Sequence, residues 1–286
     1  MSDFPELINT RSLRQTIDGG FEWVVIEFGE AFEIAFLPVL HFLNGIEAVL
    51  LFPPWWLVIA VLGGIAYAAS RSWKAAAAAA AMLFAMGAFG FWEESMETIA
   101  LMVAATVIAV VIGLPIGVLM SRSDKMETAA LPVLDIMQTL PIFVYLIPFV
   151  MLFGPGKIPA LLATIVFAVP PMIRLTNLGI RMVDKEVVEA SHAFGANGMQ
   201  RLFGVQLPLA LPNIMAGINQ TTMMALSMVV IASMIGAGGL GYQVLQGIQR
   251  LEVSRGLLAG LGIVFLAIIF DRIAQSYGKR LQAHRQ

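Results

Sequence analysis

"TIALMVAATVIAVVIGLPIGVLM", residues 98–120, is a run of 23 residues that contains no charged side chain. An α-helix needs about 20 mostly apolar residues to cross the hydrocarbon core of a bilayer, which is roughly 30 Å thick. The length and composition of this run therefore predict a transmembrane helix.

The same pattern recurs on both sides of this run. Hydrophobic residues make up 59 % of the chain and charged residues 13 %, whereas soluble domains carry about 25 % charged residues. Such a chain has too little polar surface to cover a soluble globule of its size, so we expect an all-α polytopic membrane protein with about seven transmembrane helices. The six further predicted spans, of which the first is the shortest, are residues 55–71, 74–92, 131–153, 157–178, 209–235 and 256–275.

Lysine and arginine are distributed unequally between the two sides that seven spans create. Twelve of the 17 fall on the side of the chain's C-terminus, and the other side holds Arg11, Arg14, Lys157, Arg250 and Arg255. Because cytoplasmic loops carry the excess of positive charge, we expect the C-terminus and the tail, residues 276–286, in the cytoplasm and the N-terminus outside. The location implied is the cytoplasmic (inner) membrane of a bacterium.

Residues 1–54 precede the predicted transmembrane domain, residues 55–275. The first 20 residues lack the basic region and short apolar core of a cleavable signal peptide. In residues 21–52, glutamates recur among aromatic and aliphatic residues, which favours an amphipathic helix on the outer membrane surface, kinked at Pro38. The alternative is an eighth span near residues 34–52, which would place the N-terminus in the cytoplasm.

The longest predicted cytoplasmic connection, residues 180–208, has the signals of two short helices. Asp184 can cap the first helix, Gly195 can adopt the left-handed conformation that ends it, and Asn197 can cap the second. We therefore expect a helix, a glycine turn and a second helix that lie across the inner membrane surface. An ordinary ordered loop without a partner is the competing interpretation.

The same connection resembles the "EAA" loop of permease subunits of ABC importers. That signature reads Glu-Ala-Ala, three residues, Gly, nine residues, Ile, one residue, Leu-Pro; here Ser replaces the second Ala and Val replaces Ile. The matching residues are Glu189, Ala190, Ser191, Gly195, Val205, Leu207 and Pro208.

Two other stretches, residues 134–156 and 235–273, resemble permeases for glycine betaine, proline betaine, choline and related quaternary amines such as trimethylamine N-oxide. The resemblance implies a type I ABC importer permease that forms a homodimer in the lipid membrane. It also implies two cytoplasmic ATP-binding subunits as partners and an extracytoplasmic substrate-binding protein that delivers the solute. The chain itself would then need no cofactor, because ATP and Mg²⁺ are bound by the partner subunits.

Prolines interrupt the span predicted over residues 131–153, and broken helices are common beside transport paths. With the resemblance, this favours the spans over residues 131–153, 157–178 and 209–235 as walls of the path, although packing is the alternative for each residue taken singly. Asp135, Arg174 and Asp271 lie near the inner ends of spans, where an Asp135–Arg174 pair would be structural. The candidate path or gate residues are Gln138, Pro141, Phe143, Tyr145, Met224 and Met228.

Several other function classes lack their signals. No phosphate-binding loop occurs, and "GAGGLG" at residues 236–241 follows a predicted span rather than the strand that a dinucleotide site requires. The net charge of −2 offers no basic face for nucleic acid, cysteine is absent, and His192 has no neighbours with metal-ligand spacing. We therefore expect neither catalytic residues nor a metal. The rivals to an ABC permease are an ion-coupled secondary transporter of small amines and a membrane-embedded enzyme or scaffold.

Overall fold

The computed structural model describes the backbone of residues 10–283 and the side chains of residues 11–276. Helices joined by short turns make up this part of the chain, and it contains no strand. The elements are α1 (Thr10–Leu51), α2 (Trp55–Ser70), α3 (Trp73–Ala88), α4 (Trp92–Ser121), α5 (Asp124–Thr139), α6 (Ile142–Phe153), α7 (Lys157–Arg181), α8 (Lys185–Ala193), α9 (Gly198–Arg201), the π-helix η1 (Leu202–Gln206), α10 (Leu207–Ala232), the π-helix η2 (Ser233–Ala237), α11 (Leu240–Gln249) and α12 (Val253–Ala283).

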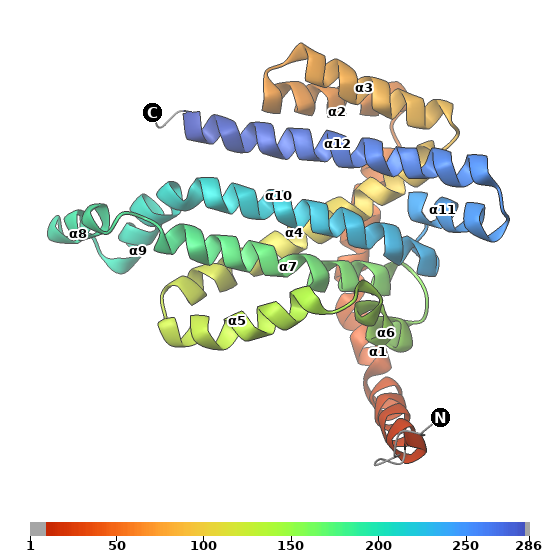
Figure 1. Ribbon diagram of the computed structural model, residues 1–286, viewed down its shortest axis with the longest axis horizontal. Helices are drawn as coiled ribbons and strands as arrows, with labels where there is room; N and C mark the ends of the chain where they lie inside the picture. The colour runs from red at the N-terminus through yellow and green to blue at the C-terminus, as the bar shows by residue number, and fades with distance from the viewer. Residues whose placement is uncertain (1–9, 284–286) are drawn as a thin grey trace, which may run out of the picture.

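Most of the long helices run along one common direction (Figure 1). One end of the bundle, called the α8 end below, carries α8, α9, the turns α2–α3 and α4–α5, and the end of α12. The opposite end, called the α11 end, carries α11 and the turns before α2, α4 and α7. Lys157, Arg250 and Arg255 lie at the α11 end, and Arg71 and Arg122 lie at the α8 end, so the predicted alternation of the chain is confirmed.

The centre of the bundle is formed by α7, which packs against α10 and α4 more extensively than any other helices pack against each other. Glycine allows this close approach: a Cβ added to Gly117 would lie 2.6 Å from Thr176 Cβ, and one added to Gly113 would lie 2.8 Å from Met172 Cβ. The two glycines are four residues apart, which is the small-xxx-small spacing of closely packed membrane helices. Gly179 serves the same purpose between α7 and α10, where a Cβ would lie 2.7 Å from Asn213 Cβ.

Every predicted span coincides with helix, but fewer than seven are long, straight spans. Five helices within the described residues are long and apolar enough to cross a membrane, or six if the bent pair α5–α6 counts as one span. That pair turns by 92° at Leu140-Pro141, because the residue before a proline is pushed into an extended conformation and Pro141 lacks an N–H. Helices α2 and α3 have 16 residues each, which is about 24 Å of helix and short of the hydrocarbon thickness.

The N-terminal segment forms one helix, α1, which begins before residue 21 and continues through Pro38. Its length and composition would allow it to cross a membrane. In Figure 1, however, α1 runs across the other helices, and only its C-terminal part packs on them, with Leu43 buried in the main core. An ion pair of 2.7 Å joins Glu47 to Lys157 at the start of α7 and holds this part of α1 near the α11 end. Residues 1–9 of the predicted external segment and residues 284–286 of the predicted tail lie outside the described residues.

Candidate coupling surface and transport path

The connection between α7 and α10 projects from the α8 end of the bundle as a short, folded segment (Figure 1). The Asp184 carboxylate accepts a hydrogen bond of 2.9 Å from the Glu186 N–H and so caps α8. Asn197 and Gln200 form a reciprocal capping box at the start of α9, with two hydrogen bonds of 2.9 Å. The predicted sequence of helix, turn and helix is therefore confirmed.

Gly195 makes the turn between the two helices. Its φ is +84°, in the left-handed region that glycine adopts without the steric penalty that a Cβ imposes. The N–H groups of Gly195 and Ala196 donate to the carbonyls of His192 and Ser191, at 2.9 and 3.1 Å, and thereby close the end of α8. Both observations agree with the role that the sequence predicted for this glycine.

A small apolar cluster fixes this segment, called the coupling segment (residues 182–206) below, to the bundle. Val183 and Leu202 are buried against Ile180 at the end of α7 and Ile214 in α10, and Val188 packs on the same cluster from α8. The α8–α9 unit is therefore seated on two of the three central helices, and a push on its outer side would reach both.

The outer side of the coupling segment has no partner among the residues whose side chains the structure describes. No residue of α8 is buried, and the side chain of Phe194 is 93 % exposed. Met199 and Phe203 are also exposed, at 60 % and 61 %. The sequence pattern did not indicate that these three apolar residues are exposed, although an aromatic residue beside the glycine of a polar loop was an available signal.

The residues of the "EAA" pattern divide between the two sides of this segment. Glu189 and Ala190 are exposed, whereas the Ser191 hydroxyl donates to the Val188 carbonyl at 2.7 Å. Val205 lies in η1, and Leu207 and Pro208 begin α10, where Leu207 packs on the apolar cluster. The structure therefore gathers the matched residues into one structural unit.

An ion network supports the α8 end beside the coupling segment. Arg181, the last residue of α7, pairs with Asp124 at 2.6 Å and with Glu127 at 3.2 Å, both in the first turn of α5. Asn177 donates to Glu127 at 2.7 Å. This network was not predicted from the sequence, although acidic residues in a first helical turn and an arginine in a last turn were its signals.

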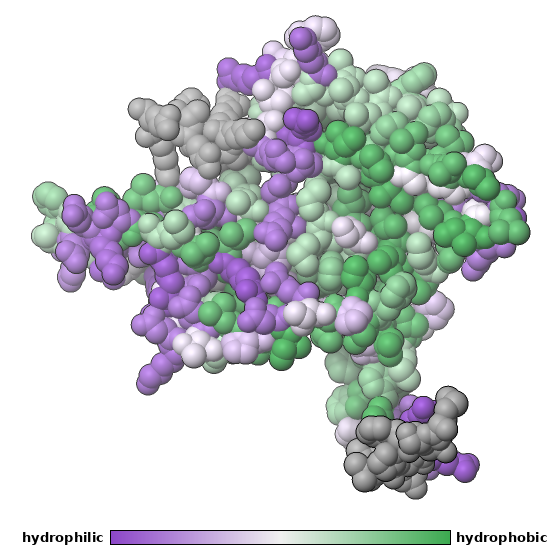
Figure 2. Space-filling view, in the orientation of Figure 1, coloured by the Kyte–Doolittle hydropathy of each residue, from purple (hydrophilic) through white to green (hydrophobic). Residues whose placement is uncertain are grey.

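A polar strip runs along one outer face of the bundle, formed by α5, α7 and α10. A groove of about 370 Å³ on this face is lined by Gln138, Arg174, Asn177 and Gln220, among others. Asp135 and Arg174 form an ion pair of 2.5 Å across α5 and α7, as the sequence suggested. Figure 2 shows hydrophilic side chains gathered over α5 and the neighbouring part of α7, beside largely hydrophobic surface toward the α11 end.

The other candidate path residues occupy different environments. Phe143 is 62 % exposed, and Met224 is partly buried. Tyr145 and Met228 do not reach the surface of the chain: Met228 is completely buried, and the Tyr145 hydroxyl donates to the Met137 carbonyl while its ring lies edge-on to Phe167. The structure assigns these two residues to packing behind the polar strip.

The glycine-rich stretch at residues 236–241 is a tight turn bound to α4. A carboxylate oxygen of Glu97 accepts the Gly239 N–H at 2.7 Å, and the Thr98 hydroxyl accepts the Leu240 N–H at 2.9 Å. A Cβ at Gly241 would lie 2.1 Å from the Val230 carbonyl oxygen. The glycines therefore allow η2 to end in a sharp bend, which agrees with rejecting a dinucleotide site.

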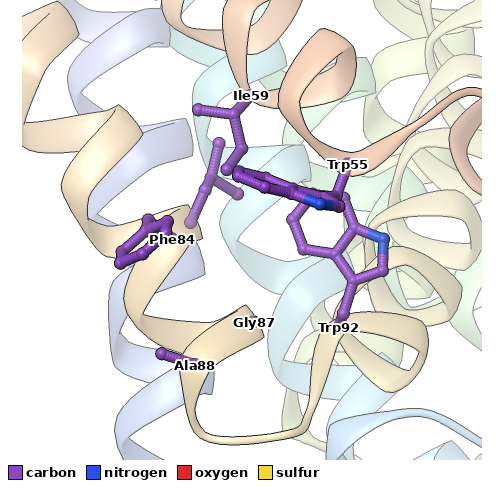
Figure 3. A pocket seen from close by; sticks show the side chains of 7 residues that line it. Trp55, Ile59, Phe84, Gly87, Ala88 and Trp92 are labelled. Carbon is purple, nitrogen blue, oxygen red and sulfur yellow. The ribbon is translucent and has the colours of Figure 1, made fainter.

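An aromatic pocket of about 370 Å³ lies at the α11 end between α2, α3 and α4 (Figure 3). Trp55 and Trp92 both line this pocket, and Trp55 lies near Phe84, with ring centroids 6.1 Å apart. Tryptophan is enriched where membrane helices meet the interface, so this pocket marks a membrane boundary rather than the path along α5, α7 and α10.

Within the side chains described, no three His, Asp or Glu residues gather closely enough to hold a metal ion.

Comparison with known proteins places this arrangement among transport proteins. Residues 109–283 match the family model described as "Binding-protein-dependent transport system inner membrane component". The chain is 49 % identical to the glycine betaine/proline betaine transport system permease protein ProW of Escherichia coli, over 91 % of this chain and 73 % of that protein. It is 41 % identical to the glycine betaine transport system permease protein OpuAB of Bacillus subtilis, over 92 % of this chain and 93 % of that protein.

The fold has a counterpart among solved structures. An inward-facing structure of the MetNI methionine ABC transporter matches 68 % of this chain and 95 % of the solved chain, with a TM-score of 0.58 and 25 % sequence identity.

Proposed function

Because the chain belongs to the family of binding-protein-dependent transport system inner membrane components and is the permease subunit of an ABC importer, we propose that its substrates are quaternary amines of the betaine type. The similar permeases ProW and OpuAB are named for transport of glycine betaine and, for ProW, proline betaine, which supports these two solutes first. Choline, carnitine and trimethylamine N-oxide belong to the same chemical class.

The coupling segment is the docking surface for the ATP-binding subunits, and its exposed side is the observation that carries this assignment. Phe194 is a large apolar side chain that is 93 % exposed at the C-terminal end of α8, a helix that the rest of the chain holds in place. Glu189, exposed on the same helix, is available to pair with a basic group of the partner. The chain is then a non-catalytic subunit, and ATP and Mg²⁺ are bound by the partners.

The substrate path runs along the polar strip, and a second copy of the chain covers it. Asp135, Gln138 and Gln220 are exposed on a helical face at membrane depth, and charged or polar side chains facing lipid are costly. A homodimer built on α5, α7 and α10 removes this cost and encloses a polar passage. The bend at Pro141 and the exposed ring of Phe143 support this path, because broken helices are common beside transport paths.

The α8 end faces the cytoplasm in this proposal, because twelve of the 17 lysines and arginines belong to the segments at that side. The α11 end and α1 then face outward, where a substrate-binding protein delivers the solute. In these terms residues 1–54 are the external segment, with α1 lying along the interface, residues 55–275 the permease domain and residues 276–286 the cytoplasmic tail. The membrane is the bacterial cytoplasmic membrane.

Reconstitution tests the proposal. The chain, an ATP-binding subunit that co-purifies with it and its substrate-binding protein are placed in liposomes, and uptake of radiolabelled glycine betaine, choline, carnitine and trimethylamine N-oxide is measured. We expect uptake only with ATP and all three proteins. Ion-driven uptake by this chain alone would instead establish a secondary transporter, and ATP-driven uptake restricted to other solute classes would overturn the substrate assignment.

A further inference from the structure

A groove of about 340 Å³ lies between α2, α3 and α12 at the α8 end, on the opposite side of the bundle from α5 (Figure 1). Its walls are apolar and shallow: Ala75 and Ala78 line it from α3, and Ile268 and Ile273 line it from α12. The alanine tract of α3 therefore leaves a furrow along part of its length instead of filling the space beside α12.

Two basic side chains, Lys74 and Arg272, line the same groove at its α8 end. Both are exposed, and neither takes part in any ion pair or side-chain hydrogen bond found among the described side chains. The neighbouring acid, Asp271, turns away: its carboxylate accepts hydrogen bonds from Gln275, at 2.7 and 2.8 Å, and from Asn219 of α10 at 3.5 Å. The positive charge at this site is therefore uncompensated within the described chain.

The start of α3 adds to this positive character. Ser72 occupies the N-cap position, but its side chain makes no capping hydrogen bond. The first N–H groups of α3 are thus not satisfied by a side-chain cap, and unpaired N–H groups at a helix N-terminus favour phosphate. Lys74, in the first turn of α3, lies next to these groups.

We propose that this groove binds an anionic phospholipid from the membrane leaflet at the α8 end. The phosphate is held between Lys74 and Arg272, and an acyl chain lies along the furrow formed by the alanines of α3 and the isoleucines of α12. The combination of a cationic mouth and an apolar floor matches a lipid, because a soluble anion has no acyl chain to cover the apolar floor. Basic pockets between membrane helices on the cytoplasmic side bind anionic lipid head groups by this chemistry. The proposal rests on the membrane placement given under Proposed function.

Native mass spectrometry of the purified full-length chain in detergent tests this site. The chain is titrated with phosphatidylglycerol and, separately, with phosphatidylcholine of the same acyl chains, and bound lipid is counted. Each lysine or arginine near an anionic surface strengthens attraction by about fivefold, so the variant Lys74→Ala/Arg272→Ala should bind phosphatidylglycerol about 25-fold more weakly. The matched variant Arg122→Ala/Lys125→Ala removes two charges elsewhere at the same end and should bind as the parent does.

A second pair of variants tests the apolar floor. Ala78→Trp fills the furrow and should also weaken phosphatidylglycerol binding, whereas Ala77→Trp, on an exposed neighbouring residue outside the groove lining, should not. Equal binding of both lipids by the parent, or equal loss in both charge variants, would overturn the proposal. The assay involves neither substrate nor ATP, so a negative result would leave the transport assignment standing, and failure of uptake would not decide lipid binding.

Discussion

Phe194 offers the sharpest test of the coupling surface, because removing its side chain should not change the stability of the isolated chain. It is 93 % exposed, so Phe194→Ala deletes no packing within the chain and should leave the melting temperature of the detergent-solubilised protein unchanged. Docking of an ATP-binding subunit, in contrast, would bury the whole ring. Complete burial of a phenylalanine side chain is worth about 1.5–3 kcal/mol, which corresponds to a Kd for the ATP-binding subunit that is about 10- to 150-fold higher in the variant.

The assay is equilibrium binding of the purified ATP-binding subunit to the immobilised chain, followed by uptake in proteoliposomes. Phe52→Ala is the matched control, since Phe52 is 92 % exposed but lies in the turn before α2, at the α11 end. We expect the control to keep both the parent Kd and the parent uptake. An unchanged Kd for Phe194→Ala, or an equal rise for Phe52→Ala, would refute the assignment of the docking surface to the coupling segment.

Three further substitutions probe the glycine turn of the coupling segment, the glycine-rich turn at the α11 end and the contact between α4 and α7. Gly195→Ala forces a Cβ into a left-handed conformation at a cost of about 1–2 kcal/mol and should lower uptake about 5- to 30-fold, whereas Gly198→Ala, with equally open surroundings, should transport normally; parity of the two in an uptake assay would contradict this. Glu97→Gln removes the charge of the carboxylate that accepts a hydrogen bond from the Gly239 N–H, in the turn between η2 and α11. Amide hydrogen exchange in this turn should therefore accelerate, while exchange in α8 stays as in the parent. Unaltered exchange in the turn would show that this hydrogen bond does not hold it. Gly117→Ala overpacks the contact between α4 and α7 and should destabilise the chain by about 1–3 kcal/mol, seen as a lower melting temperature, and Gly64→Ala, which meets no neighbour, should not; equal melting temperatures would argue against close packing at α4–α7.

The coupling segment was predictable in detail because its structure depends on local chemistry. Asp184 and Asn197 cap the helices that follow them, and Gly195 turns the chain, through contacts within a few residues. The exposure of Phe194 was not predictable. Whether an aromatic side chain faces outward or packs on α7 and α10 depends on how the whole segment is seated on the bundle.

The candidate path residues show the limit of the same reasoning. Gln138, Tyr145 and Met228 all lie in apolar stretches, and nothing in the sequence separates a residue that faces a passage from one that packs behind it. The structure places Gln138 in the polar groove and buries the other two. For Tyr145 the 92° bend at Leu140-Pro141 contributes, because it turns α6 out of line with α5. The sequence contained the proline but not the direction of the turn.

The sequence by itself determined the helical class, the alternation of the chain between two ends and the identity of the coupling segment. These properties follow from apolar run length, from the distribution of charge and from capping residues, all of which act locally. Only the tertiary structure decided that α1 lies across the bundle and that Arg181 pairs with Asp124 and Glu127. It also decided that Lys74 and Arg272 share one groove with no ion-pair partner among the described side chains. Those outcomes depend on which helices come into contact. A glycine in the sequence shows that a helix can approach another closely, but not which helix it approaches.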